Sequence, residues 1–179
     1  DLSVGEEMTK VQSVLQKTKG DIRWVKPRGF HLTFKFLGDI EQAQVAPILQ
    51  ALRQAVKTQP QLRVRTQGLG PFPTLKRPRV FWARLNGEGL KELAAKIDAA
   101  LASLGFPSEG RAFRPHITLG RVRSLNGWDR TLKQVKEYLQ YDFGESRIDT
   151  VTLYQSDLQP SGAVYTPLGV ISLNAIESA

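Results

Sequence analysis

Hydrophobic residues recur every three or four positions in four segments, a spacing typical of helices that bury one face. Ser3 and Glu6 have the spacing of a capping box, and Asp39 is the expected cap of the second helix. Gly20 and Gly105 are the expected stops of the first and third helices. The pattern predicts helices over residues 3–19, 40–57 and 90–104, and a fourth around Trp128, Leu132, Val135 and Leu139.

Other segments alternate between apolar and polar residues, which predicts strands. Residues 30–37 are the clearest case. One face would carry Phe30, Leu32, Phe34 and Phe36, and the other His31, Thr33 and Lys35. We also expect strands at 62–65, 79–85, 147–155 and 164–173, a Gly- and Pro-rich loop over 68–78, and an interruption at Pro167.

The polar face of residues 30–37 belongs to a motif that occurs twice. His31-Leu32-Thr33 is matched 85 positions later by His116-Ile117-Thr118, and these two motifs hold both histidines of the chain. From ordinary residue usage, a given histidine meets this pattern with a chance of about 1%, and both meet it with a chance on the order of one in ten thousand. The pair therefore indicates an enzyme with two like half-sites.

The predicted elements around the two motifs follow the same order, which indicates a duplication. We place the first copy at about 1–78 and the second at about 79–173, within a single domain of interleaved lobes. The first copy lacks a counterpart of strand 79–85, so we expect a further strand before Asp1 that this chain does not include. Helices mixed with strands that can pair antiparallel indicate an α+β class. We expect a bilobal fold of two pseudo-twofold-related antiparallel sheets, with outer helices around a central cleft.

Charge adds a partner to this picture. The chain of 179 residues has a formal net charge of +8, from 25 Lys and Arg against 17 Asp and Glu. Such a surface favours a polyanion, and nucleic acid is the usual one. The basic residues also gather near the two motifs and in the loop between them: Lys26, Arg28, Lys35, Lys76, Arg77, Arg79, Arg111, Arg114, Arg121 and Arg123.

Composition excludes several other classes. The chain has no cysteine, which excludes disulfides and thiol nucleophiles and suits a reducing cytosol, so we expect a cytoplasmic protein. No apolar run has the length of a membrane span and no signal peptide is visible, so we expect no membrane association. Two histidines without cysteine make a thin ligand set for a metal, and no Gly-x-Ser-x-Gly, P-loop or dinucleotide-binding pattern occurs. We therefore expect no metal and no cofactor.

Two histidines and two threonines suit displacement at phosphorus. An unperturbed histidine titrates near neutrality, so one imidazole can accept a proton from the attacking oxygen while the other protonates the leaving oxygen. A threonine two residues further along a strand lies on the same face as its histidine. Its hydroxyl can donate a hydrogen bond to a nonbridging phosphate oxygen.

These residues resemble the 2H phosphoesterase superfamily, and within it the RNA 2',3'-cyclic phosphodiesterase (2'-5' RNA ligase) family. The resemblance rests on His31–Gly38, Phe113–Arg121 and Pro78–Ala83, and it extends over essentially the whole chain. It implies a metal-free and cofactor-free opening of RNA 2',3'-cyclic phosphates to 2'-phosphates. His31 and His116 would be the acid/base pair, Thr33 and Thr118 would hold the phosphate, and ATP-independent 2'-5' ligation is a further implied activity. We expect a monomer without an obligate protein partner, because one chain supplies both half-sites.

The remaining site residues leave alternatives open. The resemblance implies phosphate binding by Arg121, yet strand parity points it away from His116 unless Gly120 permits a bulge. Lys35, Phe36, Phe72 and Trp82 are candidates for substrate binding, and Phe81 is another, although strand aromatics usually pack in a core. We expect Trp24 and Trp128 to be packing residues. Two rival functions stay open: a phosphodiesterase of small cyclic nucleotides or 2'-5' oligonucleotides, and a non-catalytic RNA-binding module.

Overall fold

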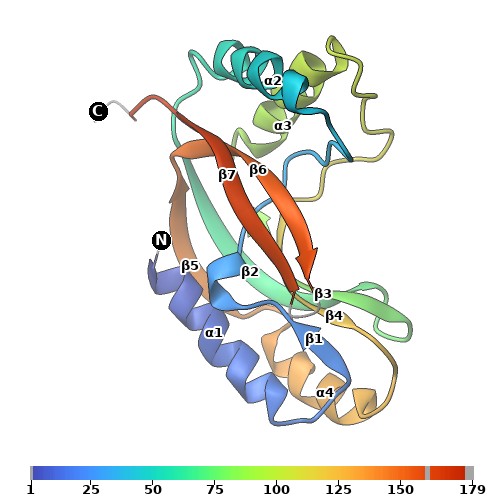
Figure 1. The fold of residues 1–179 in the computed structure, drawn as a ribbon. Coiled ribbons are helices and arrows are strands. Elements are labelled where there is room, and N and C mark those ends of the chain that lie inside the picture. The colour runs from blue at the N-terminus through green and yellow to red at the C-terminus, as the bar shows by residue number, and fades with distance from the viewer. Residues whose placement is uncertain (1, 160–161, 176–179) are drawn as a thin grey trace. The chain divides into compact units, whose positions relative to one another are not determined.

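A computed structural model describes residues 2–159 and 162–175. These residues form four α-helices close to the expected positions (Figure 1): α1 (Leu2–Gln16), α2 (Gln42–Ala55), α3 (Leu90–Ala102) and α4 (Trp128–Val135). Short 3-10 turns lie at Pro27–Gly29 and Lys136–Tyr138. None of the helices in the described part of the chain has the length and apolar character needed to cross a membrane.

The strands form two antiparallel sheets, so the expected α+β class is confirmed. The larger sheet has the order β1-β4-β3-β2-β5, and the smaller one pairs β6 with β7. The strands are β1 (Ile22–Trp24), β2 (Leu62–Pro73), β3 (Pro78–Asn86), β4 (His116–Val122), β5 (Asp142–Ile148), β6 (Thr150–Gln159) and β7 (Gly162–Ser172).

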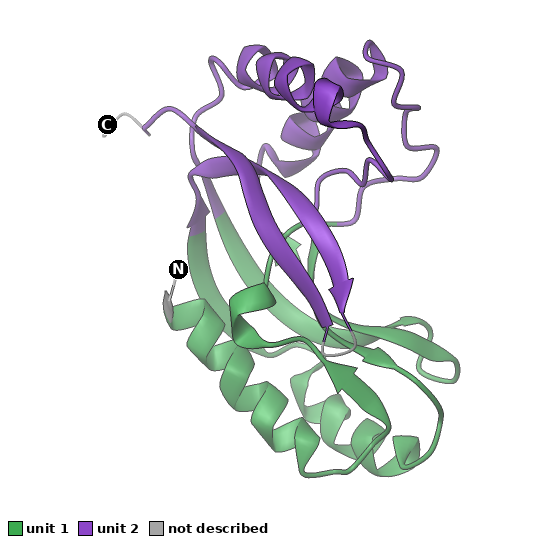
Figure 2. Ribbon diagram, in the orientation of Figure 1, with its two compact units in different colours: residues 1–32, 64–86, 115–146 green, residues 33–63, 87–114, 147–179 purple. Residues whose placement is uncertain are grey.

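The chain divides into two compact units, each built from three separate segments (Figure 2). Unit 1 comprises residues 1–32, 64–86 and 115–146, and unit 2 comprises residues 33–63, 87–114 and 147–179. The boundary between them falls inside the first motif, between Leu32 and Thr33.

The core of unit 1 lies between one face of the larger sheet and helices α1 and α4. Strand β3 shows why, because its apolar residues Phe81, Ala83 and Leu85 are buried while Arg84 between them is exposed. Trp24 meets Phe81 edge to face, with ring centroids 5.9 Å apart. The side chains that complete this core are Val4, Met8, Val11, Leu15, Leu69, Leu119, Trp128, Val135 and Phe143. The burial of Trp128 and the packing of Trp24 against this core confirm both as packing residues.

Unit 2 buries the facing sides of α2 and α3, and α2 also packs against β7. At the second contact, a Cβ on Gly169 of β7 would come within 2.5 Å of the Leu49 side chain. The helix can approach the strand this closely only because Gly169 has no side chain. The apolar side chains buried in unit 2 include Ile48, Leu49, Leu52, Val56, Leu93, Ile97, Leu101, Val151, Leu153, Ile171 and Leu173.

Two of the expected caps were wrong. Helix α1 already includes Ser3, so Ser3 is a residue of the first turn and not the cap before it. Helix α2 begins at Gln42, and its cap is Glu41 instead of the expected Asp39. The backbone N–H of Glu41 donates to Gln44 Oε1 at 2.8 Å. The stop at Gly105 is confirmed, since Gly105 has a φ of +91° and lies just after α3.

Several strand limits also differ from the prediction. The loop expected over 68–78 is largely strand. The pairing of β2 with β3 resumes at Leu69 after a bulge that follows Thr66, and β2 continues to Pro73. The single strand expected over 147–155 is two strands, β5 and β6, and the short strand β1 was not anticipated. The strand expected before Asp1 lies outside the described residues.

Residues 30–37 were predicted to be a strand, and this was wrong. In the described part of the chain, this segment has one isolated antiparallel bridge, between Leu32 and Ile117. A strand requires a neighbour that takes its backbone hydrogen bonds along its length. The strict alternation of faces therefore does not hold beyond the bridge, and Phe36 is 76% exposed while the side chain of Lys35 is 4% exposed.

Candidate functional site

The bridge at Leu32 aligns the first motif with the second. Because Leu32 pairs with Ile117 in the antiparallel direction, His31 lies opposite Thr118. The His31 Nδ1 atom lies 2.7 Å from the carbonyl oxygen of Gly29. A carbonyl can only accept, so Nδ1 carries the hydrogen and donates it. Nε2 of His31 is therefore the ring nitrogen that can exchange a proton with a substrate.

His116 begins strand β4, and an aromatic side chain supports its ring. The Trp82 ring meets the His116 ring edge to face, with centroids 4.8 Å apart, and Phe72 in turn meets Trp82 edge to face at 6.1 Å. Directly opposite His116, on β3, is Arg84. The orientation of this histidine is thus set by packing on a strand, which holds a side chain more accurately than a loop does.

One face of the larger sheet carries the candidate residues of the second motif. Residues that pair across antiparallel strands share a face, and Trp82 pairs with Thr118 while Arg84 pairs with His116. His116 and Thr118 therefore lie on the face opposite the core of unit 1. Thr118 is half-buried and Arg84 is exposed.

Arg121 joins this face because of a β-bulge. The register between β3 and β4 shifts between Phe81 and Trp82, so that Phe81 pairs with Gly120 and Val80 pairs with Arg121. Val80 and Trp82 lie two residues apart in β3 and share a face, which places Arg121 on the face of His116 and Thr118. Strand parity counted from His116 had placed Arg121 on the opposite face of the sheet. The bulge that Gly120 could permit accounts for the difference.

Gly120 is required at this bulge by its neighbours. A Cβ built on Gly120 would lie 2.8 Å from Ile22 Cγ2, 3.2 Å from Trp24 Cε3 and 3.3 Å from the carbonyl oxygen of Arg23. Strand β1 thus packs directly over Gly120. Because Gly120 has no side chain, β1 can pair with β4 beside Arg121.

In unit 2, Lys35, a candidate for substrate binding, forms an ion pair. Its ammonium donates to Asp98 of α3 and, at 2.7 Å, to the carbonyl oxygen of Pro107. The hydrogen bond from Lys35 lowers the pKa of Asp98 below its ordinary value, and the backbone N–H of Glu109 donates to the same carboxylate. Lys35 therefore ties the segment after Thr33 to α3, a structural role that competes with the predicted substrate contact.

The other predicted residues fall into two groups. Thr33 and Phe36 are exposed in unit 2, and Phe34 stacks on Phe113 with centroids 5.7 Å apart. In unit 1, Phe72 is 42% exposed and Trp82 is half-buried, whereas Phe81 is fully buried in the core and is inaccessible to a substrate.

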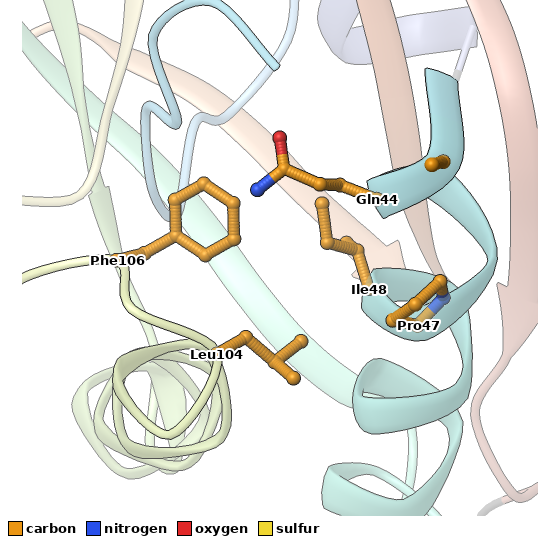
Figure 3. A pocket seen from close by; sticks show the side chains of 6 residues that line it. Gln44, Pro47, Ile48, Leu104 and Phe106 are labelled. Carbon is orange, nitrogen blue, oxygen red and sulfur yellow. The ribbon is translucent and has the colours of Figure 1, made fainter. Parts of the chain in front are cut away.

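A hollow between α2 and the end of α3 is too small for a typical substrate site. Figure 3 shows Phe106 and Leu104 facing Ile48 and Pro47 across it, with the amide of Gln44 as the polar group. Its volume of about 150 Å³ is below the range of about 300–1,000 Å³ typical of small-molecule sites. Across residues 2–159 and 162–175, no three His, Cys, Asp or Glu side chains gather as metal ligands would.

Comparison with known proteins agrees with this geometry. A family model described as LigT like phosphoesterase matches the chain twice, over residues 2–82 and 85–165. The chain belongs to the LigT-like phosphoesterase family. The double match also confirms the duplication that the repeated motifs indicated.

Relatives in this family cover most of the chain. The RNA 2',3'-cyclic phosphodiesterase of Aquifex aeolicus is 36% identical over 149 residues, which are 80% of this chain and 78% of the relative. The protein of the same name from Methanocaldococcus jannaschii is 32% identical over 163 residues, covering 91% and 90% of the two chains. The crystal structure of TT0787 from Thermus thermophilus aligns with a TM-score of 0.83 at 27% identity, and covers 98% of this chain and 94% of that one.

The sequence reasoning missed two arginines on the face of the larger sheet. Arg84 lies two residues after Trp82 in a strand that was predicted, so parity could have placed both on the same face, although not opposite His116. Arg23 lies in β1, a strand that was not anticipated because three residues are too few for a recognisable alternation.

Proposed function

We propose that this protein is an RNA 2',3'-cyclic phosphodiesterase that opens terminal cyclic phosphates by paired-histidine acid/base catalysis. One observation carries the proposal: the bridge between Leu32 and Ile117 and the bulge in β4 assemble His31, His116, Thr118 and Arg121 in one unit. Two imidazoles, a hydroxyl and a guanidinium are the groups that displacement at phosphorus uses. The names of the family relatives support the same substrate.

The proposed reaction balances as a hydrolysis. The oxygen of water forms a bond to phosphorus while its proton passes to His116, and the bond from phosphorus to the 3'-oxygen breaks. That oxygen takes a proton from Nε2 of His31, which leaves a 2'-phosphate and a 3'-hydroxyl. The hydrogen bond from Nδ1 of His31 to Gly29 suits this role, because it keeps Nε2 directed as the exchanging atom.

The phosphate needs charge stabilisation during this step. The Thr118 hydroxyl and the Arg121 guanidinium lie on the face of His116, where they can donate to nonbridging oxygens. Thr33 is assigned the matching role from its place in the first motif. With an RNA 5'-hydroxyl replacing water as the attacking group, the same machinery would form a 2'-5' linkage without ATP.

The test uses two substrates and a chelator. Wild-type protein is incubated, with and without EDTA, with an oligoribonucleotide ending in a 2',3'-cyclic phosphate and with a 2',3'-cyclic mononucleotide, and phosphorus NMR identifies the products. We expect the oligonucleotide to be converted to the 2'-phosphate. Persistence of both substrates would exclude the proposed activity, and turnover that stops only with EDTA would indicate a metal-dependent reaction.

The same experiment separates the rival functions. Faster turnover of the mononucleotide than of the oligonucleotide would favour a small cyclic nucleotide as the natural substrate. Binding of the oligonucleotide without turnover would favour a non-catalytic RNA-binding module. A cytoplasmic location, a monomeric state and independence from cofactors stay predictions from the sequence.

A further inference from the structure

Strand β1 brings a second arginine beside Arg121. The register pairs Arg23 of β1 with Arg121 of β4, and Arg121 with Val80 of β3. Val80 pairs in turn with Phe72 of β2. These four residues form one row across the sheet. The row of Gly120 and Phe81 separates it from the row that contains Thr118 and Trp82, so the two outer rows share a face.

The neighbours of Arg23 fix the face on which it lies. Trp24 pairs with Gly120 and packs against Phe81 in the core of unit 1. Because successive residues of a strand point to opposite faces, Arg23 lies on the other face, with Arg121. The half-buried position of Arg23 and the exposed position of Arg121 agree with this arrangement at the sheet surface.

Arg23 and Arg121 lie on neighbouring strands and share a face, so this part of the sheet surface carries two positive charges side by side. An anion bound across the pair would accept charge-assisted hydrogen bonds from both side chains. Arg121 lies three residues after Thr118 in β4, and residues rise about 3.3 Å along a strand, so the two lie within about 10 Å of each other. Arg23 lies on the neighbouring strand, about 4.8 Å from Arg121. With a terminal phosphate at Thr118, Arg121 and Arg23 are therefore within reach of the neighbouring phosphate of the same RNA chain.

We propose that Arg23, together with Arg121, binds the phosphodiester that precedes the terminal nucleotide, and so makes the enzyme prefer an RNA end to a free cyclic nucleotide. This rests on the proposed function for the location of the terminal phosphate. Arg121 serves both phosphates, and Arg23 serves only the second. The chemical class recognised is a nucleotide chain with at least one internal phosphate.

The test compares two substrates that differ by one internal phosphate. We measure kcat/KM for a dinucleotide ending in a 2',3'-cyclic phosphate and for the cyclic mononucleotide, with wild type, Arg23→Gln, Arg23→Lys and the control Arg53→Gln at an exposed position of α2. Arg23→Gln should lose about tenfold on the dinucleotide, as expected for one lost charged hydrogen bond, and less than about twofold on the mononucleotide. Its slope of log kcat/KM against log salt should fall by about 0.7. Arg23→Lys should keep part of the preference, and Arg53→Gln all of it.

Equal losses on both substrates, or no loss on the dinucleotide, would overturn this role for Arg23. A binding measurement keeps the outcome independent of turnover. The affinity of a dinucleotide with a 2'-phosphate end should fall about tenfold in Arg23→Gln and stay unchanged in Arg53→Gln. If wild type opens neither substrate but this difference in affinity remains, the proposed activity is wrong and the phosphate contact stands. If the affinities are equal, the contact itself is wrong.

Discussion

Substituting alanine for Gly120 tests the packing that turns Arg121 toward His116. The new Cβ would lie 2.8 Å from Ile22 Cγ2, against 3.4 Å for ordinary contact, so the isoleucine would have to retreat by about 0.6 Å. The ring of Trp24 and the backbone of Arg23 block the alternatives at 3.2 and 3.3 Å. Overpacking of this kind costs about 1–3 kcal/mol. We therefore expect Gly120→Ala to lower the free energy of unfolding by that amount.

The assay is thermal unfolding followed by circular dichroism, with Gly70→Ala as the matched control. Gly70 lies in β2 of the same sheet, and a Cβ there meets no heavy atom within 4 Å. For a chain of this size, each kcal/mol lowers the melting temperature by about 2–4 °C. Gly120→Ala should melt several degrees below wild type, and Gly70→Ala should melt at or above it. Equal melting temperatures for the two variants would refute the close packing of β1 over the bulge.

Two further predictions concern the supports of the two motifs. Asp98→Asn leaves the buried Lys35 ammonium without its partner, so it should melt below wild type at neutral pH. Because the pKa of Asp98 is lowered in the folded protein, the stability that its carboxylate contributes is present above its ordinary pKa of about 3.9 and is lost as the pH falls further. The difference in melting temperature between wild type and Asp98→Asn should therefore shrink below about pH 4. A difference that persists unchanged at acid pH would contradict the ion pair. Trp82→Ala removes the ring against which His116 packs, and a lost aromatic pair of about 0.5–1.5 kcal/mol should lower kcat roughly two- to tenfold. Trp82→Phe should recover part of the rate, and an unchanged kcat in Trp82→Ala would show that the ring does not position His116.

The candidate residues of the site could be named from the sequence because they lie in local motifs. The paired His-x-Thr segments, the basic residues near them and the α+β class all follow from residues close together in the sequence. Strand β3 was also predictable, since Phe81, Ala83 and Leu85 alternate with polar or half-buried residues from Val80 to Asn86. The family membership and the duplication then follow from the same motifs.

The errors arose where long-range contacts decide the local conformation. Alternation over 30–37 predicted a strand, but the described chain offers that segment a single bridge, and Lys35 instead turns to Asp98, 63 residues away in the sequence. The direction of Arg121 depends on a bulge whose glycine is required by β1, a strand too short to recognise from its pattern. Residues 68–73 looked like a loop because of their glycines and prolines, yet pairing with β3 keeps them in a strand.

The most direct test of the central claim is the single-turnover rate of His31→Ala and His116→Ala on a cyclic-phosphate-ended oligoribonucleotide in EDTA. Circular dichroism of each variant confirms the fold, and Arg53→Gln serves as the control outside unit 1. The account predicts that each histidine variant loses at least the roughly 10²-fold typical of a missing general acid or base, while Arg53→Gln keeps the wild-type rate. A folded variant without His31 or without His116 that turns over at the wild-type rate would contradict paired-histidine catalysis.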